Sequence, residues 1–213
     1  MGVIKQGILG GFSGKVGSVV GTSWKGRAVM KAMPLSVANP RTTGQVQQRT
    51  KMAGVVAAAR LVLGGSIALL DNPFSGNISG YNRFVKRNIA FVSYSGILYP
   101  NSAKLSEGVL GRIILSTAVS AVDGNNAVTV TWTSEQSPYN LDTDKVVVTV
   151  MNSDFTEVLN AGTDVGQRST TGSTVIGLNR VLEAGENIYV FASAIRTDKK
   201  YCSDSVYVDK VVL

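Results

Sequence analysis

The first 36 residues alternate short apolar runs with glycine, which recurs at positions 2, 7, 10, 11, 14, 17, 21 and 26. A glycine inside a helix costs about 1 kcal/mol relative to alanine, so this density excludes a helix. The segment Lys15–Met33 instead predicts extended chain broken by turns, with the Lys25-Gly26-Arg27 corner closing a β-hairpin. Such a segment has little to bury within itself. We therefore expect a glycine-rich arm and hairpin that add to another surface, in this molecule or in a neighbour.

Residues 37–105 carry two helical patterns. Asn39-Pro40 ends the extended segment, and Thr42 with Gln45 three residues later matches a capping box. Apolar residues then repeat at helical spacing up to Gly64-Gly65: Met52, Val55, Val56, Ala59, Val62 and Leu63. A second helix is expected over about residues 79–93, apolar on one side and basic on the other. The two helices are expected to pair through their apolar faces.

From about residue 109 the pattern changes to short runs of Val, Thr, Ile and Tyr between turn signals. Seven strands are predicted: Arg112–Val122, Ala127–Thr133, Lys145–Met151, Thr156–Ala161, Thr174–Leu178, Asn187–Arg196 and Ser205–Val212. Seven short strands in about 100 residues are typical of an immunoglobulin-like sandwich. Trp132 ends one strand, and Tyr189, four residues after Gly185, resembles the tyrosine corner of fibronectin type III-like domains.

These patterns predict an α+β protein in three parts. Residues 1–36 form the basic arm and hairpin, residues 37–105 the two-helix region, and residues 106–213 an immunoglobulin-like antiparallel β-sandwich. The predicted sandwich implies a fold and no particular function.

Charge divides the chain into two halves. Residues 1–105 carry 13 Lys or Arg and one acid, a net charge of +12, whereas residues 106–213 carry 8 Lys or Arg and 13 acids, a net charge of −5. The basic half is expected to meet something negative: nucleic acid, an anionic membrane or an acidic protein surface. Its basic residues are dispersed and match no nucleic-acid-reading motif. We favour an acidic protein partner, most simply the acidic half of a second copy in a head-to-tail contact.

The sequence offers no catalytic constellation. The chain has no histidine and a single cysteine, Cys202, which removes histidine-based catalysis and thiolate or imidazole metal sites within one chain. The run before Lys15 is not a phosphate loop, because Leu9 and Val16 stand where glycine and Ser or Thr are required. Asp142 and Asp144 are too sparse for a calcium loop. We expect no enzyme activity, no cofactor and no metal.

Cysteine usage and hydropathy indicate where the chain resides. A lone cysteine forms no intrachain disulfide and fits a reducing compartment. The N-terminus lacks the long apolar run of a signal peptide. The most apolar stretch, Gly54–Leu70, is interrupted by Arg60 and Gly64-Gly65. We expect it to be a buried helix and expect no contact with a membrane.

Three N-terminal elements carry a resemblance to a known family. GGFSGKVG begins at Gly10, WKG follows at Trp24, and NPRT at Asn39 leads into a Gln- and Arg-rich helix start. This pattern resembles a family of small proteins from Bacteroidetes and their crAss-like bacteriophages, which join it to a β-rich C-terminal domain. The resemblance implies a phage or prophage virion component and carries no functional residues over.

Together these observations predict a structural virion protein that forms a homo-oligomeric ring in the tail or neck. Its partners would be copies of itself and other phage structural proteins, after synthesis in the host bacterial cytoplasm. The alternatives are a capsid-internal or genome-associated nucleic-acid-binding protein, a bacterial adhesion module and, last, a secreted enzyme. The predicted assembly interface consists of Phe12, Lys15, Val19, Trp24, Lys25, Arg27 and Arg41.

Overall fold

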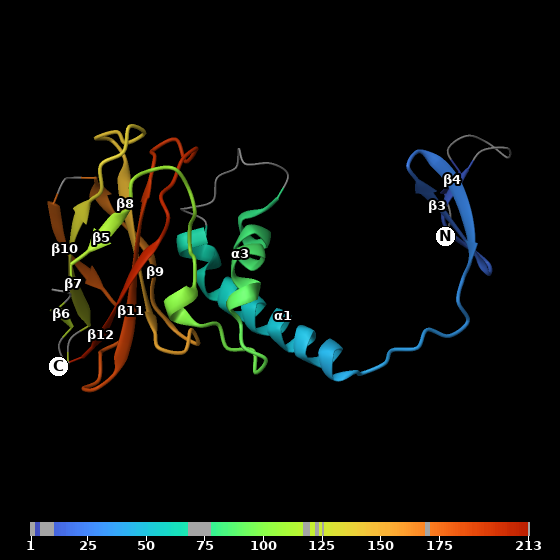
Figure 1. Cartoon of the computed structure of the whole chain (residues 1–213), viewed down its shortest axis with the longest axis horizontal. Helices are drawn as coiled ribbons and strands as arrows, with labels where there is room; N and C mark the ends of the chain where they lie inside the picture. The colour runs from blue at the N-terminus through green and yellow to red at the C-terminus, as the bar shows by residue number, and fades with distance from the viewer. Residues whose placement is uncertain are drawn as a thin grey trace. The chain divides into compact units, whose positions relative to one another are not determined.

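A computed structural model describes residues 3–4, 11–67, 78–116, 120–121, 124, 126–168 and 171–212 (Figure 1). The chain divides into two compact units, Met1–Thr42 and Thr43–Leu213. The first boundary predicted from sequence, after residue 36, lies close to this division. The second, after residue 105, falls inside the larger unit, for a reason given below.

The N-terminal unit is a four-stranded antiparallel sheet whose strands follow one another in chain order. They are β1 (Val3–Ile4), β2 (Phe12–Val16), β3 (Val19–Trp24) and β4 (Arg27–Ala32). We call them the N-terminal sheet. The expected hairpin corner is confirmed, because Trp24 pairs with Arg27 while Lys25 and Gly26 have φ angles of 49° and 80°. Two positive φ angles define a type I′ turn, whose twist matches that of the flanking strands.

The larger unit begins with its helices. They are α1 (Thr43–Val62), the π-helical turn η1 (Leu63–Ile67), α3 (Gly80–Asn88) and the 3₁₀ turns η2 (Ile89–Phe91) and η3 (Pro100–Ser102). The Ser79 hydroxyl caps α3 by accepting from the Asn82 backbone N–H at 3.3 Å. The helix is shorter than the expected 79–93. At its end the Asn88 amide donates to the Lys104 carbonyl at 2.9 Å and accepts from the Lys104 N–H at 2.8 Å, which ties this end to the following segment.

Two antiparallel sheets complete the larger unit, with strand orders β10-β7-β5 and β12-β11-β8-β9, and with β6 paired to β7. The strands are β5 (Ile113–Leu115), β6 (Ser120–Ala121), β7 (Ala127–Ser134), β8 (Lys145–Asn152), β9 (Val158–Gln167), β10 (Thr171–Gly177), β11 (Asn187–Ile195) and β12 (Val206–Val211). Of the expected strand 112–122, the structure describes two short strands, in which Leu115 pairs with Trp132 and Ser120 with Thr129. Residues 117–119 and 122 of that prediction lie outside the described residues.

The two sheets pack face to face around a shared core. Inward side chains of one sheet, such as Val130 and Trp132, meet Val148 and Val190 of the other. Trp132 lies against the bare backbone of Gly172, where an added Cβ would approach the indole Cε2 to 2.4 Å. A tight two-layer packing of alternating residues follows from the period-2 pattern of these strands.

The helices cover the outer face of the β12-β11-β8-β9 sheet (Figure 1) and enclose a second core. Val55 and Phe84 from the helices pack in the same cluster as Val147, Met151 and Phe191 from the sheet. Strand β8 is therefore buried on both faces. This shared core unites residues on both sides of the predicted boundary at residue 105 in one compact unit.

Within the described residues, one helix, Thr43–Ile67, is long and apolar enough by length and composition to cross a membrane. Its C-terminal half lies in the second core, where Val55, Ala59 and Val62 are fully buried. Apolar residues of this helix thus contribute to the hydrophobic core of the larger unit.

Candidate assembly surfaces

The N-terminal sheet has no core of its own. Of its described residues, only Gly21 is buried, and the Phe12 ring lies across that glycine. An added Cβ at Gly21 would approach the Phe12 ring to 2.6 Å, so a side chain there would displace the one aromatic ring that packs on the sheet. Every other described side chain of this unit is half-buried or exposed.

Cross-strand pairing separates the side chains of this sheet into two faces. Residues paired directly opposite each other project to the same side, and the side alternates along each strand. One side, the apolar face, carries Phe12, Val16, Val19, Ala28, Met30 and Ala32. The other, the basic face, carries Lys15, Val20, Thr22, Trp24, Arg27, Val29 and Lys31.

Both faces are open to solvent in this chain. On the apolar face, the exposed fraction is 71% for Met30 and 53% for Val16; on the basic face it is 62% for Trp24. The Lys25 ammonium at the hairpin tip lies 5.1 Å from the centre of the Trp24 ring, a cation–π contact. Exposed large apolar side chains gathered on one small unit are typical of an interaction site.

The outer edge of β4 offers backbone groups as well. In the described part of the chain β4 pairs with β3 alone, so its other edge is unpaired. An unpaired edge is a template for a strand from another chain. A linker follows, residues 33–42, which is exposed throughout and includes Leu35 and Val37.

All seven sequence-predicted interface residues lie in the N-terminal unit, and six of them lie in its sheet or at the hairpin tip. Lys15, Trp24 and Arg27 share the basic face, and Lys25 lies at its tip. The predicted apolar members, Phe12 and Val19, lie together on the opposite face and are half-buried. Arg41 is exposed in the linker and belongs to neither face. Their role at an interface stays a prediction.

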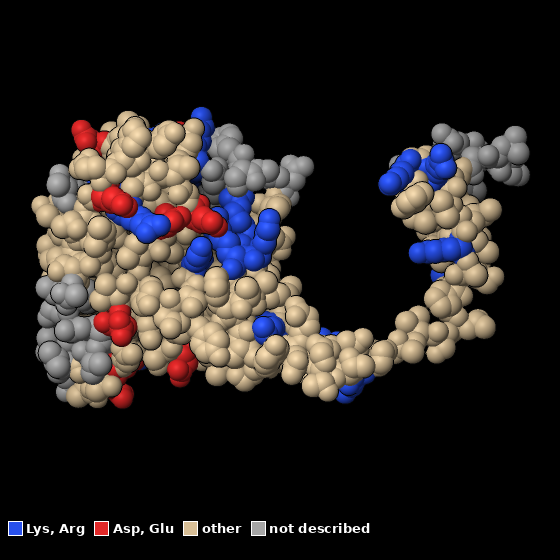
Figure 2. Space-filling view, in the orientation of Figure 1, with Lys and Arg blue, Asp and Glu red and all other residues tan. Residues whose placement is uncertain are grey.

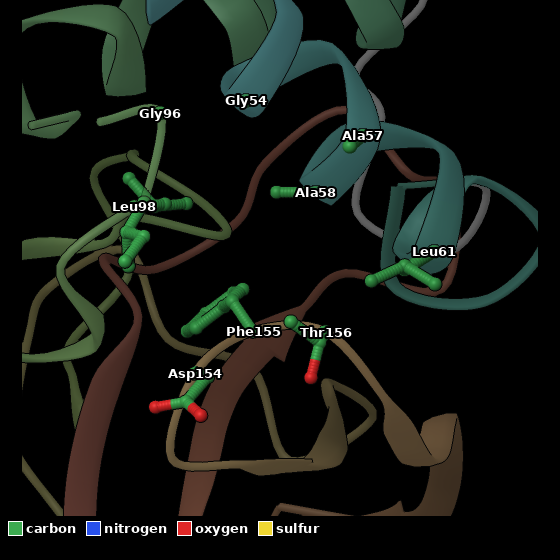
Figure 3. Close-up of a pocket in the computed structure, with 10 residues that line it drawn as sticks. Gly54, Ala57, Ala58, Leu61, Gly96, Leu98, Asp154, Phe155 and Thr156 are labelled. Carbon is green, nitrogen blue, oxygen red and sulfur yellow. The ribbon is translucent and has the colours of Figure 1, made fainter. Parts of the chain in front are cut away.

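A second candidate surface lies on the larger unit and was not predicted from sequence. It is a groove of about 280 Å³ between α1, the segment 96–98 and the β8–β9 turn (Figure 3). It is lined by Gly54, Ala57, Ala58, Leu61, Gly96, Ile97, Leu98, Asp154, Phe155 and Thr156. Nearly all of these residues present carbon to the groove, and Asp154 is the one charged member.

Two features shape this groove. The α1 backbone at Gly54 touches the Gly96 carbonyl so closely that an added Cβ would lie 1.9 Å from the carbonyl oxygen. Phe155, in the β8–β9 turn, has a φ of 54°, which is strained for a bulky residue. Its ring is held edge-on against Phe191, with ring centres 5.7 Å apart. Strain of this kind persists only where the surrounding packing enforces it.

Electrostatics around the groove are uneven. Figure 2 shows Lys and Arg gathered over the helical part of the larger unit, while Asp and Glu lie mainly over its sheets. The exposed Asp154 carboxylate accepts a hydrogen bond from the Ser153 hydroxyl at 3.3 Å. Burial raises the pKa of the nearby Tyr189 hydroxyl, and the charges of Asp209, Tyr207 and Asp154 raise it further.

The fold and its surfaces define an α+β protein with a coreless N-terminal sheet joined to a two-core unit. Residues 11–209 match the profile of DUF6266, a family of unknown function, and the chain belongs to this family. Comparison with functionally curated proteins finds no significant match.

Proposed function

We propose that the protein is a structural, non-enzymatic building block that assembles by docking its N-terminal sheet onto neighbouring subunits. The observation that carries this proposal is the absence of a core in that sheet, which buries only Gly21 among its described residues. The sequence resemblance to phage-associated proteins specifies the assembly further. It supports a homo-oligomeric ring in the tail or neck of a bacteriophage virion, built from subunits made in the host bacterial cytoplasm.

General physical principles indicate that this sheet is stable only when it is docked on another surface. Small sheets need a hydrophobic face packed against something before they are stable in water. Units of about 40 residues usually need disulfides, metals or oligomerisation to fold. The chain's one cysteine, Cys202, lies in the other unit. Docking of the apolar face on a neighbour would provide the missing burial.

For the larger unit we propose an immunoglobulin-like sandwich, as the strand pattern predicts. Its support is the two antiparallel sheets around Trp132. The Tyr189 ring lies with Tyr207 in the second core, at a centre-to-centre distance of 6.0 Å. It therefore packs on the helix-covered face of its sheet and not between the two sheets.

The decisive experiment removes the N-terminal sheet. A chain of residues 43–213 keeps both hydrophobic cores and should remain folded, with circular dichroism and thermal unfolding close to those of the full chain. Native mass spectrometry should show closed oligomers for the full chain and monomers for the shortened one. Oligomers of unchanged copy number without the sheet would contradict the proposal.

The basic face supports one alternative, a capsid-internal or genome-associated nucleic-acid-binding protein. Lys15, Arg27 and Lys31 share this face with the exposed Trp24, which could stack on a base. Phosphate contacts give an affinity that falls steeply with salt. Micromolar or tighter, salt-dependent binding of the full chain to DNA, lost in Trp24→Ala, would favour this alternative.

A further inference from the structure

The groove beside α1 has no assigned occupant. Its volume of about 280 Å³ lies just below the range of about 300–1,000 Å³ typical of small-molecule sites. The lining offers carbon surface from Ala57, Leu61 and Phe155, and few polar groups that could orient a cofactor (Figure 3). A groove of this size and character suits one or two inserted side chains, which is how protein interfaces seat their anchors.

The rim of the groove restricts the chemistry of the occupant. Asp154 is exposed at the rim, and its carboxylate accepts a hydrogen bond from the hydroxyl of its neighbour Ser153. An apolar groove with one carboxylate at its edge is complementary to an apolar anchor that has a cation beside it. Such pairing fixes orientation and excludes wrong partners.

The β3–β4 hairpin tip has this composition. Trp24 is 62% exposed, Lys25 lies against its ring, and Arg27 is its cross-strand partner. Tryptophan and arginine are the residues most enriched among interface anchors. The type I′ turn places Trp24 and Arg27 directly opposite each other at the hairpin tip.

We propose that the groove binds the β3–β4 hairpin tip of a second copy of this chain, with Trp24 in the groove and Lys25 or Arg27 beside Asp154. This inference rests on the proposed function and adds to it the receiving site. Charge complementarity supports a second copy as the occupant. Residues 1–42 carry six Lys or Arg and no acid, whereas Asp154 is the one charged residue that lines the groove. The contact is head-to-tail, the geometry that closes into rings or extends into filaments.

Two single variants test the two sides of this contact. Trp24→Ala removes the anchor, and Ala57→Trp fills the groove from an exposed position on α1. Each should weaken self-association at least about tenfold, the loss expected for an interface anchor. Tyr139→Ala, which removes another exposed aromatic residue, and Gln48→Trp, on an exposed part of α1, are the matched controls and should assemble normally. If Ala57→Trp unfolds the chain, Asp154→Lys tests the same site from its exposed rim.

Mixing the two variants separates a contact between copies from one within a chain. The Ala57→Trp chain keeps its hairpin tip and the Trp24→Ala chain keeps its groove, so an equimolar mixture retains one intact contact per pair. Native mass spectrometry should show heterodimers in the mixture and monomers in each variant alone. Monomers in the mixture would overturn the proposal. They are also the result expected if the hairpin tip docks into the groove of its own chain, because mixing cannot restore a contact within one chain.

The outcomes also separate this inference from the proposed function. If removal of residues 1–42 abolishes assembly while Trp24→Ala and Ala57→Trp assemble normally, the groove is not the receiving site and the proposed function stands. If the wild-type chain is monomeric at all concentrations and the mixture forms no heterodimer, both are overturned.

Discussion

The two units of this chain differ in how much of their apolar surface they bury within the chain. The larger unit buries two clusters of side chains, one between its sheets and one beneath its helices. The N-terminal sheet forms regular strands with a well-formed type I′ turn, yet buries a single glycine among its described residues. Local sequence signals are therefore sufficient to specify strands and turns, but not to stabilise them.

The apolar residues of the two units have different physical roles. In the larger unit, apolar residues are fixed by the shape of a core that the chain itself provides. In the N-terminal sheet, residues such as Met30 and Trp24 contact mainly solvent in the single chain. Their apolar character has a physical purpose only when another surface covers them. The comparison leads to four predictions, given in order of decreasing effect.

The largest effect is expected from large-to-small substitution in the second core. Phe191→Ala should lower the free energy of unfolding by about 3–5 kcal/mol, because the ring is 1% exposed and packs edge-on against Phe155. Met30→Ala in the N-terminal sheet should change it by less than about 0.5 kcal/mol in the monomer. Urea unfolding of both variants at low protein concentration measures the difference. Equal losses of unfolding free energy in the two variants would contradict the view that only the larger unit has a stabilising core.

The next effect concerns the buried Arg168, whose guanidinium donates to the Gly111 and Glu135 carbonyls at 2.9 and 2.8 Å and to the Asn140 amide oxygen at 3.0 Å. Arg168→Met would remove all three hydrogen bonds, although the Glu135 carbonyl and the Asn140 amide oxygen each keep a second donor, and should cost about 3 kcal/mol. The control is Arg112→Met, which removes an exposed ion pair and should cost less than about 1 kcal/mol. Comparable unfolding curves for the two variants would show that Arg168 does not pin these loops together.

A smaller effect is expected at the hairpin tip. Gly26 has a φ of 80°, so Gly26→Ala should strain the turn by about 1–2 kcal/mol although its Cβ meets no neighbouring atom. Assembly should weaken about tenfold, while thermal unfolding of the larger unit stays unchanged. Gly44→Ala, also in open space but within α1, should leave assembly unaffected. Normal assembly of the Gly26→Ala chain would show that the turn geometry is not required.

The smallest effect is a pH dependence confined to the larger unit. The hydrogen bond from Arg180 lowers the pKa of the Glu186 carboxyl. A lowered folded-state pKa stabilises the protein above the unfolded-state pKa, and the stabilisation disappears as the pH falls through the folded-state value. Arg180→Met should cost less than about 1 kcal/mol at pH 7, since both side chains are partly exposed, and almost nothing near pH 3. A cost that does not shrink on acidification would exclude this ion pair as its cause.

The sequence predicts those elements whose signals are local. The Lys25-Gly26 turn, α1 and most strands from residue 127 onward are encoded by neighbouring residues, and the structure places them within a few positions of the prediction. The exception is β9, expected at 156–161, which extends to Gln167. The packing of the helices on the sheet has a sequence signal too, because the run Val146–Met151 is apolar at every position except Thr149, as is typical of strands buried on both faces. The groove has no such signal. It depends on the contact of Gly54 with Gly96 and on the backbone of Phe155, which only the tertiary fold brings together.

Hydrogen exchange on the full chain, in its assembled and dissociated states, tests the central claim most directly. The account predicts that the amides of β3 and β4 exchange within seconds in the monomer and become strongly protected on assembly, whereas those of β8 and β11 are protected in both states. Protection of β3 and β4 that is equally strong in the monomer would show that the N-terminal sheet is stable by itself, and would contradict the account.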